Sequence, residues 1–218
     1  MTFEEALRGK KAALIDMDGV LYDSMPRHCR AWRDTMLEEG LDIPEEEFFL
    51  YEGMTGPATI NLLMEREKGV TLPLEVCNEI YARKAARFRA QGSPAPMPGA
   101  AEKIALMHRL GLITVLVTGS AQSSLLDRLE NDYPGAFPPE RRVTALDVTN
   151  GKPHPEPYLR GLEKAGVSAG EAVVLENAPL GVRAGRAAGI FTIAWLTGPI
   201  PSERFRAEGA NLILEFRV

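Results

Sequence analysis

Short, mostly apolar runs alternate with longer amphipathic segments along most of the chain. Each run is followed directly by polar residues or glycine. This pattern is typical of strands that are buried on both faces of a parallel sheet. We predict strands at residues 12–15, 112–117, 172–175 and 191–196, with weaker candidates at residues 143–146 and 211–214.

The segments between these runs carry apolar residues at intervals of three and four, the period of a helix with one buried face. Helices that alternate with buried strands indicate a Rossmann-like α/β fold, in which a doubly wound parallel sheet has helices on both sides. Ligands bind beyond the carboxyl ends of the strands in such sheets, so the polar strand ends should converge there. The predicted helices are residues 100–109, 121–130, 155–165 and 180–188.

One long segment breaks this alternation. Residues 27–90 contain amphipathic helical stretches, such as 28–39 and 74–89, and no convincing strand. A run rich in proline and glycine, residues 91–99, follows and suits a hinge. We therefore predict an α/β core of residues 1–24 and 92–218 with an inserted all-helical cap of residues 25–91. A hinged cap of this kind can close over the crevice and exclude water.

Composition narrows the range of ligands. The 218 residues are 45% hydrophobic, enough for one sizeable core with a smaller module. The formal charge is −5 and the pI is near 5.4, so no broad basic surface is expected for nucleic acid. An anionic substrate must then be met locally, by a cation or by backbone amides. Small phosphates fit this condition.

The apolar runs also bear on location. None approaches the roughly 20 apolar residues of a membrane span, and the first eleven residues lack the apolar run of a signal peptide. We expect a cytoplasmic protein with no membrane partner, as a monomer or a small homo-oligomer. The two cysteines, Cys29 and Cys77, lack partners at zinc-ligand spacing and are expected to be reduced and buried or half-buried.

The first strand ends in two aspartates, Asp16 and Asp18, which are followed by Gly19. A turn that begins at this glycine can bring both carboxyl groups into one pocket. An aspartate is ionised at neutral pH, so Asp16 can attack phosphorus while Asp18 donates and accepts protons. We expect burial under the closed cap to raise the pKa of Asp18.

A dianionic phosphate repels a carboxylate nucleophile, which calls for a divalent cation with oxygen ligands, such as Mg²⁺. Glu176 and Asn177 follow the third predicted strand and are candidates to complete a metal site with Asp16 and Asp18. The donors for the phosphoryl oxygens and the balancing charge come from other strand ends: Thr118, the amides of Gly119 and Ser120 ahead of a helix expected to begin at residue 121, and Lys152.

Ordinary structural roles compete with each of these assignments. An aspartate pair before glycine is common in turns, a threonine after a strand often caps a helix, and most loop lysines are simply solvated. Gly181, Gly185 and Gly189 do not form a dinucleotide-binding fingerprint, and no Walker-type phosphate loop is present. The functional interpretation depends on all four strand ends occurring together.

Four segments in order resemble the motifs of the haloacid dehalogenase superfamily, in the subfamily of β-phosphoglucomutase and many small phosphatases. They are Asp16-Met17-Asp18-Gly19-Val20, Thr118-Gly119-Ser120, Gly151-Lys152-Pro153 and Glu176-Asn177-Ala178-Pro179-Leu180-Gly181-Val182. The resemblance covers essentially the whole chain, including the cap. It implies that Asp16 forms an aspartyl-phosphate, that Asp18 acts as acid and then base, and that Mg²⁺ contacts Asp16, the Asp18 backbone carbonyl and the acid of the fourth motif. Members that cleave carbon–halogen bonds are expected to lack the second aspartate.

Two positions depart from the commonest family pattern. Asn177 stands where the family often has aspartate, which leaves the metal site one charge short. We hypothesise that Glu52, in the cap, restores that charge, as in a similar branch of the subfamily that hydrolyses inorganic pyrophosphate. The same cap loop lacks the arginine that mutases use for the sugar phosphate, whereas Lys84 matches a subfamily cap lysine.

The resulting prediction is a hydrolase of a small phosphorylated substrate, pyrophosphate or a phosphomonoester. A sugar phosphate isomerase of the β-phosphoglucomutase type is the alternative, because cap shape decides whether water or sugar receives the phosphoryl group. A catalytically silent binding protein is the third. His28, one helical turn before Trp32, either adjusts proton transfer near the hinge or simply packs on its helix.

Overall fold

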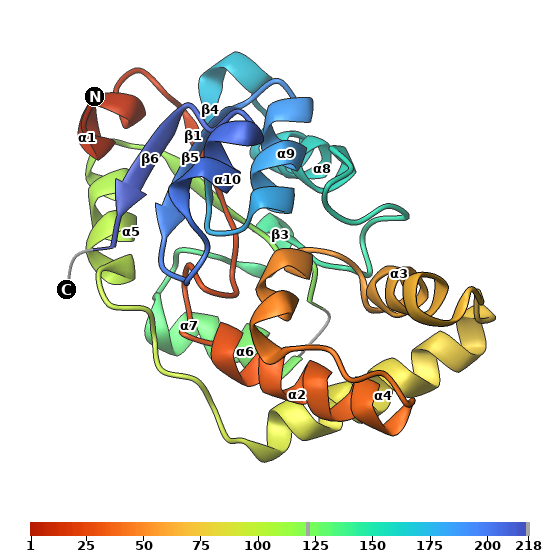
Figure 1. Cartoon of the computed structure of the whole chain (residues 1–218). Coiled ribbons are helices and arrows are strands. Elements are labelled where there is room, and N and C mark those ends of the chain that lie inside the picture. The colour runs from red at the N-terminus through yellow and green to blue at the C-terminus, as the bar shows by residue number, and fades with distance from the viewer. Residues whose placement is uncertain (121–122, 217–218) are drawn as a thin grey trace.

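The computed structural model describes residues 1–120 and 123–216 and contains a six-stranded parallel sheet of order β3-β2-β1-β4-β5-β6 (Figure 1). The central strand β1 pairs on one side with β2 and on the other with β4. The doubly wound α/β fold is thus confirmed. The strands are β1 (Ala12–Ile15), β2 (Ile113–Val117), β3 (Arg142–Val143), β4 (Ala172–Glu176), β5 (Phe191–Leu196) and β6 (Leu212–Glu215).

Each face of the sheet is buried under helices, because successive side chains of a strand point to opposite sides. Ala13 and Ile15 of β1 belong to one apolar cluster, with α1 (Phe3–Leu7) and α5 (Ala100–Arg109). Ala12 and Leu14 belong to the other, with helices α8 and α9. The remaining core helices are α6 (Ser123–Leu126), α7 (Leu129–Asp132), α8 (Glu156–Ala165), α9 (Pro179–Ala187) and α10 (Ser202–Ala207), with single 3₁₀ turns η2 (Pro139–Arg141) and η3 (Ala169–Glu171).

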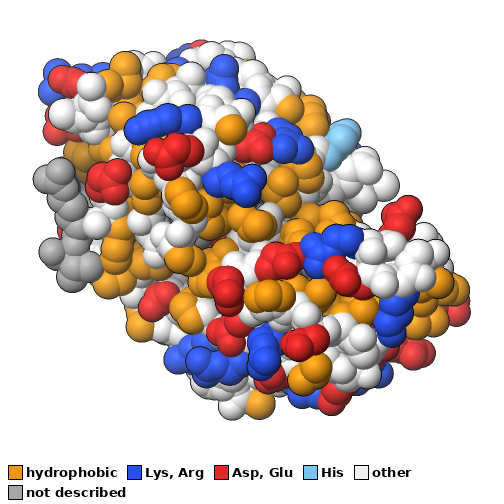
Figure 2. Space-filling view, viewed as in Figure 1, with side chains coloured by type: hydrophobic (Ala, Val, Ile, Leu, Met, Phe, Trp, Pro, Cys, Tyr) orange, Lys and Arg blue, Asp and Glu red, His pale blue; other side chains and the backbone are white. Residues whose placement is uncertain are grey.

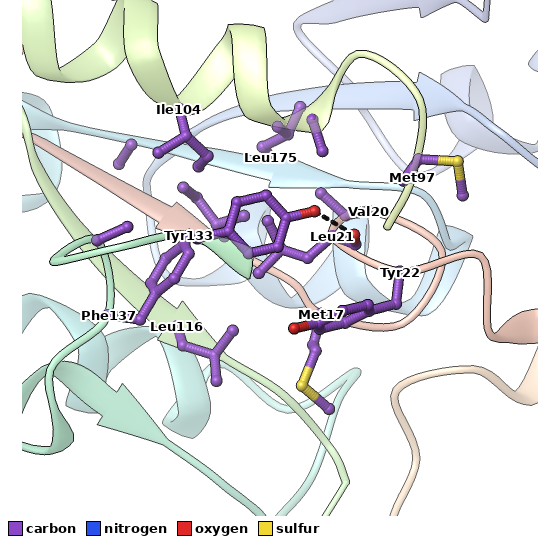
Figure 3. Packing of buried hydrophobic residues seen from close by; sticks show 14 of the residues in the cluster. Met17, Val20, Leu21, Tyr22, Met97, Ile104, Leu116, Tyr133, Phe137 and Leu175 are labelled. Atoms are coloured by element: carbon purple, nitrogen blue, oxygen red, sulfur yellow. Dashed lines mark hydrogen bonds between the residues drawn. The ribbon is translucent and has the colours of Figure 1, made fainter. Parts of the chain in front are cut away.

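The first cluster also anchors the chain just after β1. The Tyr133 hydroxyl donates a hydrogen bond to the backbone carbonyl of Leu21, and Tyr133 packs edge-on against Phe137 (Figure 3). Tyr22 lies edge-on to the same tyrosine. The segment that follows the paired aspartates is therefore held against the core, in a cluster that also includes Ala31 and Phe88 of the cap.

Two predicted elements differ from the observed ones. The strand expected at residues 143–146 ends at Val143, because Asp147 accepts hydrogen bonds from both the amide and the hydroxyl of Thr144 and closes a turn. Residues 121–122 of the helix expected at 121–130 lie outside the described residues. The described remainder is divided between α6 and α7, and Arg128 at the break donates to the Pro94 carbonyl.

The helices inserted after β1 lie below the sheet (Figure 1) and build a third apolar cluster. Trp32, Phe48 and Leu63 are among its buried members. We keep residues 25–91 as our definition of the cap. The cap elements are α2 (Met25–Glu38), η1 (Glu45–Tyr51), α3 (Gly56–Lys68) and α4 (Leu74–Ala90), and the chain returns to the core where Tyr22 pairs with Pro96.

The surface and the thiols agree with the composition. On the face shown in Figure 2, acidic and basic side chains are intermixed over core and cap alike. Cys29 and Cys77 are free and buried, as predicted. Within residues 1–120 and 123–216, no helix is both long and apolar enough to cross a membrane.

Candidate active site

The polar residues after the strands meet at one edge of the sheet, as predicted. Asp16 follows β1 and donates its amide to the Leu175 carbonyl on β4, while Thr118 follows β2. Gly19 turns the chain with φ +80°, and a Cβ there would lie 1.9 Å from the Asn177 side-chain nitrogen. Glycine is thus required both for the turn and for the close approach. The cavity at this edge is lined from the core by Asp16, Asp18, Thr118, Gly119 and Ser120.

Lys152 links the nucleophile to a second carboxylate. Its ammonium group donates to Asp16 Oδ1 at 2.5 Å, to Glu176 Oε1 at 2.6 Å and to the Val117 carbonyl at 3.0 Å. Burial opposes the charge, but the two carboxylates outweigh it and raise the pKa of Lys152. Lys152 is therefore a fixed cation beside Asp16, the position expected for a group that neutralises phosphate.

The surroundings of Asp16 disfavour its ionised form. Burial raises the pKa of its carboxyl well above the usual value; Lys152 opposes this, and the charges of Glu176 and Asp18 add to it. Its Oδ2 atom is buried and has no hydrogen-bond partner. An orphaned carboxylate oxygen in a buried cavity needs a cation or an electrophile as its partner.

The second aspartate is held by the cap. Asp18 Oδ1 accepts from the Ser24 hydroxyl at 2.7 Å and lies 3.0 Å from His28 Nε2. Burial acts to raise the pKa of Asp18, but His28, Ser24 and Lys84 outweigh it and lower the pKa on balance. Our expectation that cap closure raises this pKa is therefore wrong: the cap brings hydrogen-bond donors as well as desolvation.

His28 connects Asp18 to Lys84. Its Nδ1 lies 2.5 Å from the Lys84 ammonium, which can only donate, so Nδ1 accepts and Nε2 carries the proton toward Asp18. Burial, and then the Lys84 charge, lower the pKa of His28 and favour the neutral ring, which also stacks on Phe88. His28 therefore does more than pack on its helix, because it also bridges Asp18 and Lys84.

Lys84 is buried among aromatic rings. Its ammonium lies 5.0 Å from the ring centre of Trp32, 5.8 Å from Tyr81 and 5.7 Å from Phe88. Burial lowers its pKa to about 8, and Asp18 opposes the shift. Cation–π contacts of this kind stabilise a desolvated ammonium group. Lys84 lines the same cavity as Asp16, as the family resemblance implies.

The cap also contributes an acid. Glu52 follows η1, is 8% exposed, and its Oε2 accepts from Asn177 Nδ2 at 3.1 Å. The next residue, Gly53, packs directly on the core: a Cβ on Gly119 would lie 2.7 Å from the Gly53 carbonyl oxygen. A Cβ on Gly53 would lie 2.8 Å from the Lys152 side chain. The cap is therefore closed, and Glu52 enters the site from the cap side.

Three buried oxygens in this region have no hydrogen-bond partner: Asp16 Oδ2, Glu52 Oε1 and Asn177 Oδ1. They come from three separate segments and are the ligand type that Mg²⁺ prefers. Among the described residues no group of three His, Cys, Asp or Glu side chains is arranged to hold a metal ion, and one of the three orphaned oxygens belongs to an asparagine. The side chains fit a hard divalent cation.

Charge leads to the same conclusion. With all four carboxyl groups ionised and His28 neutral, four carboxylates face two ammonium groups. Two negative charges then remain, the amount that one divalent cation neutralises. Burial, and then the charges of Asp16 and Glu176, raise the pKa of Glu52 well above its usual value. The carboxylates are Asp16, Asp18, Glu52 and Glu176, and the ammonium groups are those of Lys84 and Lys152.

Glu176 differs from our expectation. Its Oε1 accepts from Lys152 and from the Tyr158 hydroxyl, each at 2.6 Å, and its Oε2 accepts from the amides of Asn177 and Ala178. These four donors use the capacity of a carboxylate. The geometry therefore does not support Glu176 as a metal ligand; it is the counter-ion of Lys152.

The role predicted for the Ser120 amide, after β2, also needs a correction. The Ser120 amide donates to the Thr118 hydroxyl oxygen at 3.0 Å, so this amide serves the loop rather than an incoming phosphate. Because that oxygen already accepts, the Thr118 proton is directed elsewhere and can reach a phosphoryl oxygen. The helix start expected at residue 121 lies outside the described residues.

Sequence reasoning missed two residues of the site. Ser24 lies six positions after Asp18 and Tyr158 six after Lys152. Neither spacing corresponds to a motif that carries chemistry, and a tyrosine on an amphipathic helix is expected to pack in the core, as Tyr158 also does. Their hydroxyl partners appear only when the strand ends are brought together.

Comparison with known proteins agrees with this geometry. The profile of the haloacid dehalogenase-like hydrolase family matches residues 10–189, most of the chain. The chain belongs to this family. Its named relatives include phosphatases, which identifies the chain as a phosphatase. Hexitol phosphatase A from Escherichia coli (strain K12) is 32% identical over 186 residues, covering 84% of this chain and 82% of the relative.

Two further family members set the range of relatives. Glycerol-1-phosphate phosphohydrolase 2 from Saccharomyces cerevisiae is 30% identical over 214 residues, covering 94% of this chain and 81% of that protein. A Bacteroides vulgatus structure provisionally named a β-phosphoglucomutase superposes with a TM-score of 0.91 at 44% identity, covering 97% of this chain and 90% of that one. The family and the β-phosphoglucomutase-like subfamily predicted from the motifs are confirmed.

Proposed function

We propose that this phosphatase is a Mg²⁺-dependent hydrolase of inorganic pyrophosphate or a small phosphomonoester, acting through an aspartyl-phosphate on Asp16. The observation that carries the proposal is the contact between Glu52 and Asn177. It brings a cap carboxylate to the fourth motif, where this chain lacks the usual aspartate. A cap that closes through its own cation ligand favours a compact, highly charged substrate.

The reaction assigns a distinct role to each core residue. Asp16 attacks phosphorus, the bond from phosphorus to the leaving oxygen breaks, and Asp18 donates a proton to that oxygen. Asp18 then takes a proton from water, which attacks the aspartyl-phosphate and releases inorganic phosphate. Thr118 and Lys152 donate to the phosphoryl oxygens as their charge rises.

Mg²⁺, when bound by Asp16, Asn177, Glu52 and the Asp18 carbonyl, supplies charge neutralisation between the carboxylate nucleophile and the phosphate. The chain itself supplies the proton path. The proton that Asp18 first donates can reach it along the line from Lys84 through His28, and the proton that Asp18 later takes from water can return by the same line. This line exists only with the cap closed, since His28 and Lys84 both belong to cap helices.

The leaving group is limited by the cap. The cavity between cap and core offers about 60 Å³ to the centres of water molecules. Its cap wall carries Met25, Trp32, Phe48 and Tyr81, with Lys84 as its cation. A small anionic leaving group that accepts from Lys84 fits this space, and phosphate is such a group.

Glu52→Gln tests the proposal directly. The variant keeps the shape of the side chain but removes its charge, so the Mg²⁺ concentration for half-maximal release of phosphate from pyrophosphate should rise roughly 10- to 100-fold. Glu46→Gln, an exposed glutamate on the same 3₁₀ helix, is the matched control. Unchanged Mg²⁺ dependence and turnover in Glu52→Gln would contradict a metal role for Glu52.

The structural likeness to the Bacteroides vulgatus protein keeps a sugar phosphate mutase as the second candidate. Against it, the cap loop from Tyr51 to Gly56 contains no arginine to hold a second phosphate. A Mg²⁺-supplemented panel of pyrophosphate, β-glucose 1-phosphate, hexose phosphates and triose phosphates separates the two. Glucose 6-phosphate formed from β-glucose 1-phosphate with little free phosphate would select the mutase. The absence of nucleic-acid and membrane partners, a cytoplasmic location and a monomeric or small oligomeric state stay predictions.

A further inference from the structure

The Tyr158 hydroxyl is a buried group that the proposed reaction does not use. Tyr158 lies on α8, is fully buried, and donates to Glu176 Oε1 at 2.6 Å. Lys152 lies 5.1 Å above the centre of the same ring and donates to the same oxygen. Burial raises the pKa of Tyr158, so the hydroxyl stays a donor. The phenol thus supports both members of the Lys152–Glu176 ion pair.

Glu176 is confined on its other sides as well. Its second oxygen accepts from the backbone amides of Asn177 and Ala178. A Cβ on Gly181 would lie 1.8 Å from Oε1, so α9 passes the carboxylate with no room to spare. The Tyr158 hydroxyl is one of the groups that hold Glu176. Replacing Tyr158 with phenylalanine removes this hydrogen bond and leaves the ring in place, so the packing volume is kept.

Glu176 has an alternative partner, a cation bound at the orphaned oxygens. Lys152 bonds both Glu176 Oε1 and Asp16 Oδ1, and Glu176 is next to Asn177 in the chain, so its carboxylate lies beside two of the side chains that carry orphaned oxygens. A Glu176 carboxylate that lost one donor would have a free lone pair and a freer side chain, able to turn toward a cation. Lys152, whose ammonium is divided between Glu176 and Asp16, would follow it.

We propose that Tyr158 is a positioning residue that holds Glu176 away from the cation and keeps Lys152 directed at Asp16. This inference rests on the proposed function, because it concerns the same cation site. It explains why a residue expected to bind metal instead carries four protein donors. It also gives asparagine at position 177 and glutamate at position 52 the metal roles that Glu176 is prevented from taking.

The test is Tyr158→Phe, read in two ways. We expect kcat for acetyl phosphate to fall about tenfold with KM changed less than twofold, since Lys152 loses its alignment in the reacting complex. We also expect tighter Mg²⁺ binding in the absence of substrate. The Mg²⁺ concentration for half-maximal thermal stabilisation should fall about tenfold, because a released carboxylate adds a charged ligand.

Two further variants separate positioning from simple stability. In a Glu176→Gln background, Tyr158→Phe should change neither kcat nor the Mg²⁺ midpoint by more than twofold, since Tyr158 acts through Glu176. Tyr133→Phe removes another buried tyrosine hydroxyl, bonded to the Leu21 carbonyl, and should lower Tm alone.

Wild-type kcat and Mg²⁺ midpoint in Tyr158→Phe, or equal effects with and without Glu176, would overturn the inference. Weaker Mg²⁺ binding would overturn the claim that Glu176 is held off the cation. Loss of pyrophosphate hydrolysis as an activity leaves these readouts intact, because they use acetyl phosphate and the metal alone.

Discussion

The two sides of the active-site cavity hold their charges in different ways. On the core side, Lys152 has three hydrogen-bond acceptors, and Glu176 has four donors, all from the sheet edge and its helices. On the cap side, the Lys84 ammonium contacts His28 and is otherwise surrounded by aromatic rings. The core groups take all of these hydrogen bonds from the core itself, whereas the cap groups reach the site only through closure.

This contrast suggests that the core and the cap have different functions in the reaction. Changes on the core side should abolish chemistry for every substrate, because the same nucleophile and the same cation are always used. Changes on the cap side should alter which leaving group is accepted and how tightly the cation is held. Three variants test this difference, and the most damaging one is given first.

Asp16→Asn should give the largest loss. The amide cannot form an aspartyl-phosphate, so phosphate release should fall on the order of 10³-fold or more for all substrates of the panel. The measurement is phosphate release under Mg²⁺ saturation, with Tm confirming that the variant is folded. Activity retained within tenfold would show that another group attacks phosphorus.

Lys84→Met should give an intermediate, substrate-dependent loss. Removing the cation should lower kcat/KM for pyrophosphate on the order of 10²-fold, the cost of losing one donor to a developing charge. Lys103→Met, which removes a half-buried lysine over the Trp195 ring, is the control and should retain wild-type activity. Equal losses in the two variants would show that Lys84 contributes only to packing.

The same lysine predicts a pH dependence. Burial lowers the pKa of Lys84 to about 8, so it is a cation below that pH and neutral above it. The wild-type kcat/KM for pyrophosphate should therefore decrease as pH rises through about 8. Lys84→Met should lack this decrease. A decrease that persists in the variant would assign it to another group.

Gly119→Ala should give the smallest loss, through closure alone. A Cβ there would lie 2.7 Å from the Gly53 carbonyl, so the cap loop must shift by a few tenths of an ångström. We expect kcat/KM to fall about tenfold, less than the roughly 10²-fold that a 1 Å misplacement can cost. Gly170→Ala, where a Cβ meets nothing within 4 Å, is the matched control. Wild-type activity in Gly119→Ala would show that closure tolerates this shift.

Much of the fold was predictable because its signals are local. The strand of residues 12–15 was predicted with its observed bounds, since a four-residue apolar run before a turn has one good interpretation. The strand expected at 143–146 was too long, because the turn after Val143 depends on two hydrogen bonds to a single side chain, that of Asp147. The motifs located Asp16, Asp18, Thr118 and Lys152 in the site.

The rest of the site depends on partners that are distant in the chain. Local patterns were enough to predict the succession of strands and helices, the four motifs and the chemistry that they carry. The folded structure was needed to show that Glu176 faces Lys152 and Tyr158, that Asp18 has a lowered pKa, and that Glu52 meets Asn177, 125 positions away. The difference lies in how far apart in the chain the interacting residues are. Periodicity indicates which face of a helix or strand is buried, whereas the direction of a carboxylate depends on donors from elements that meet only in the folded chain.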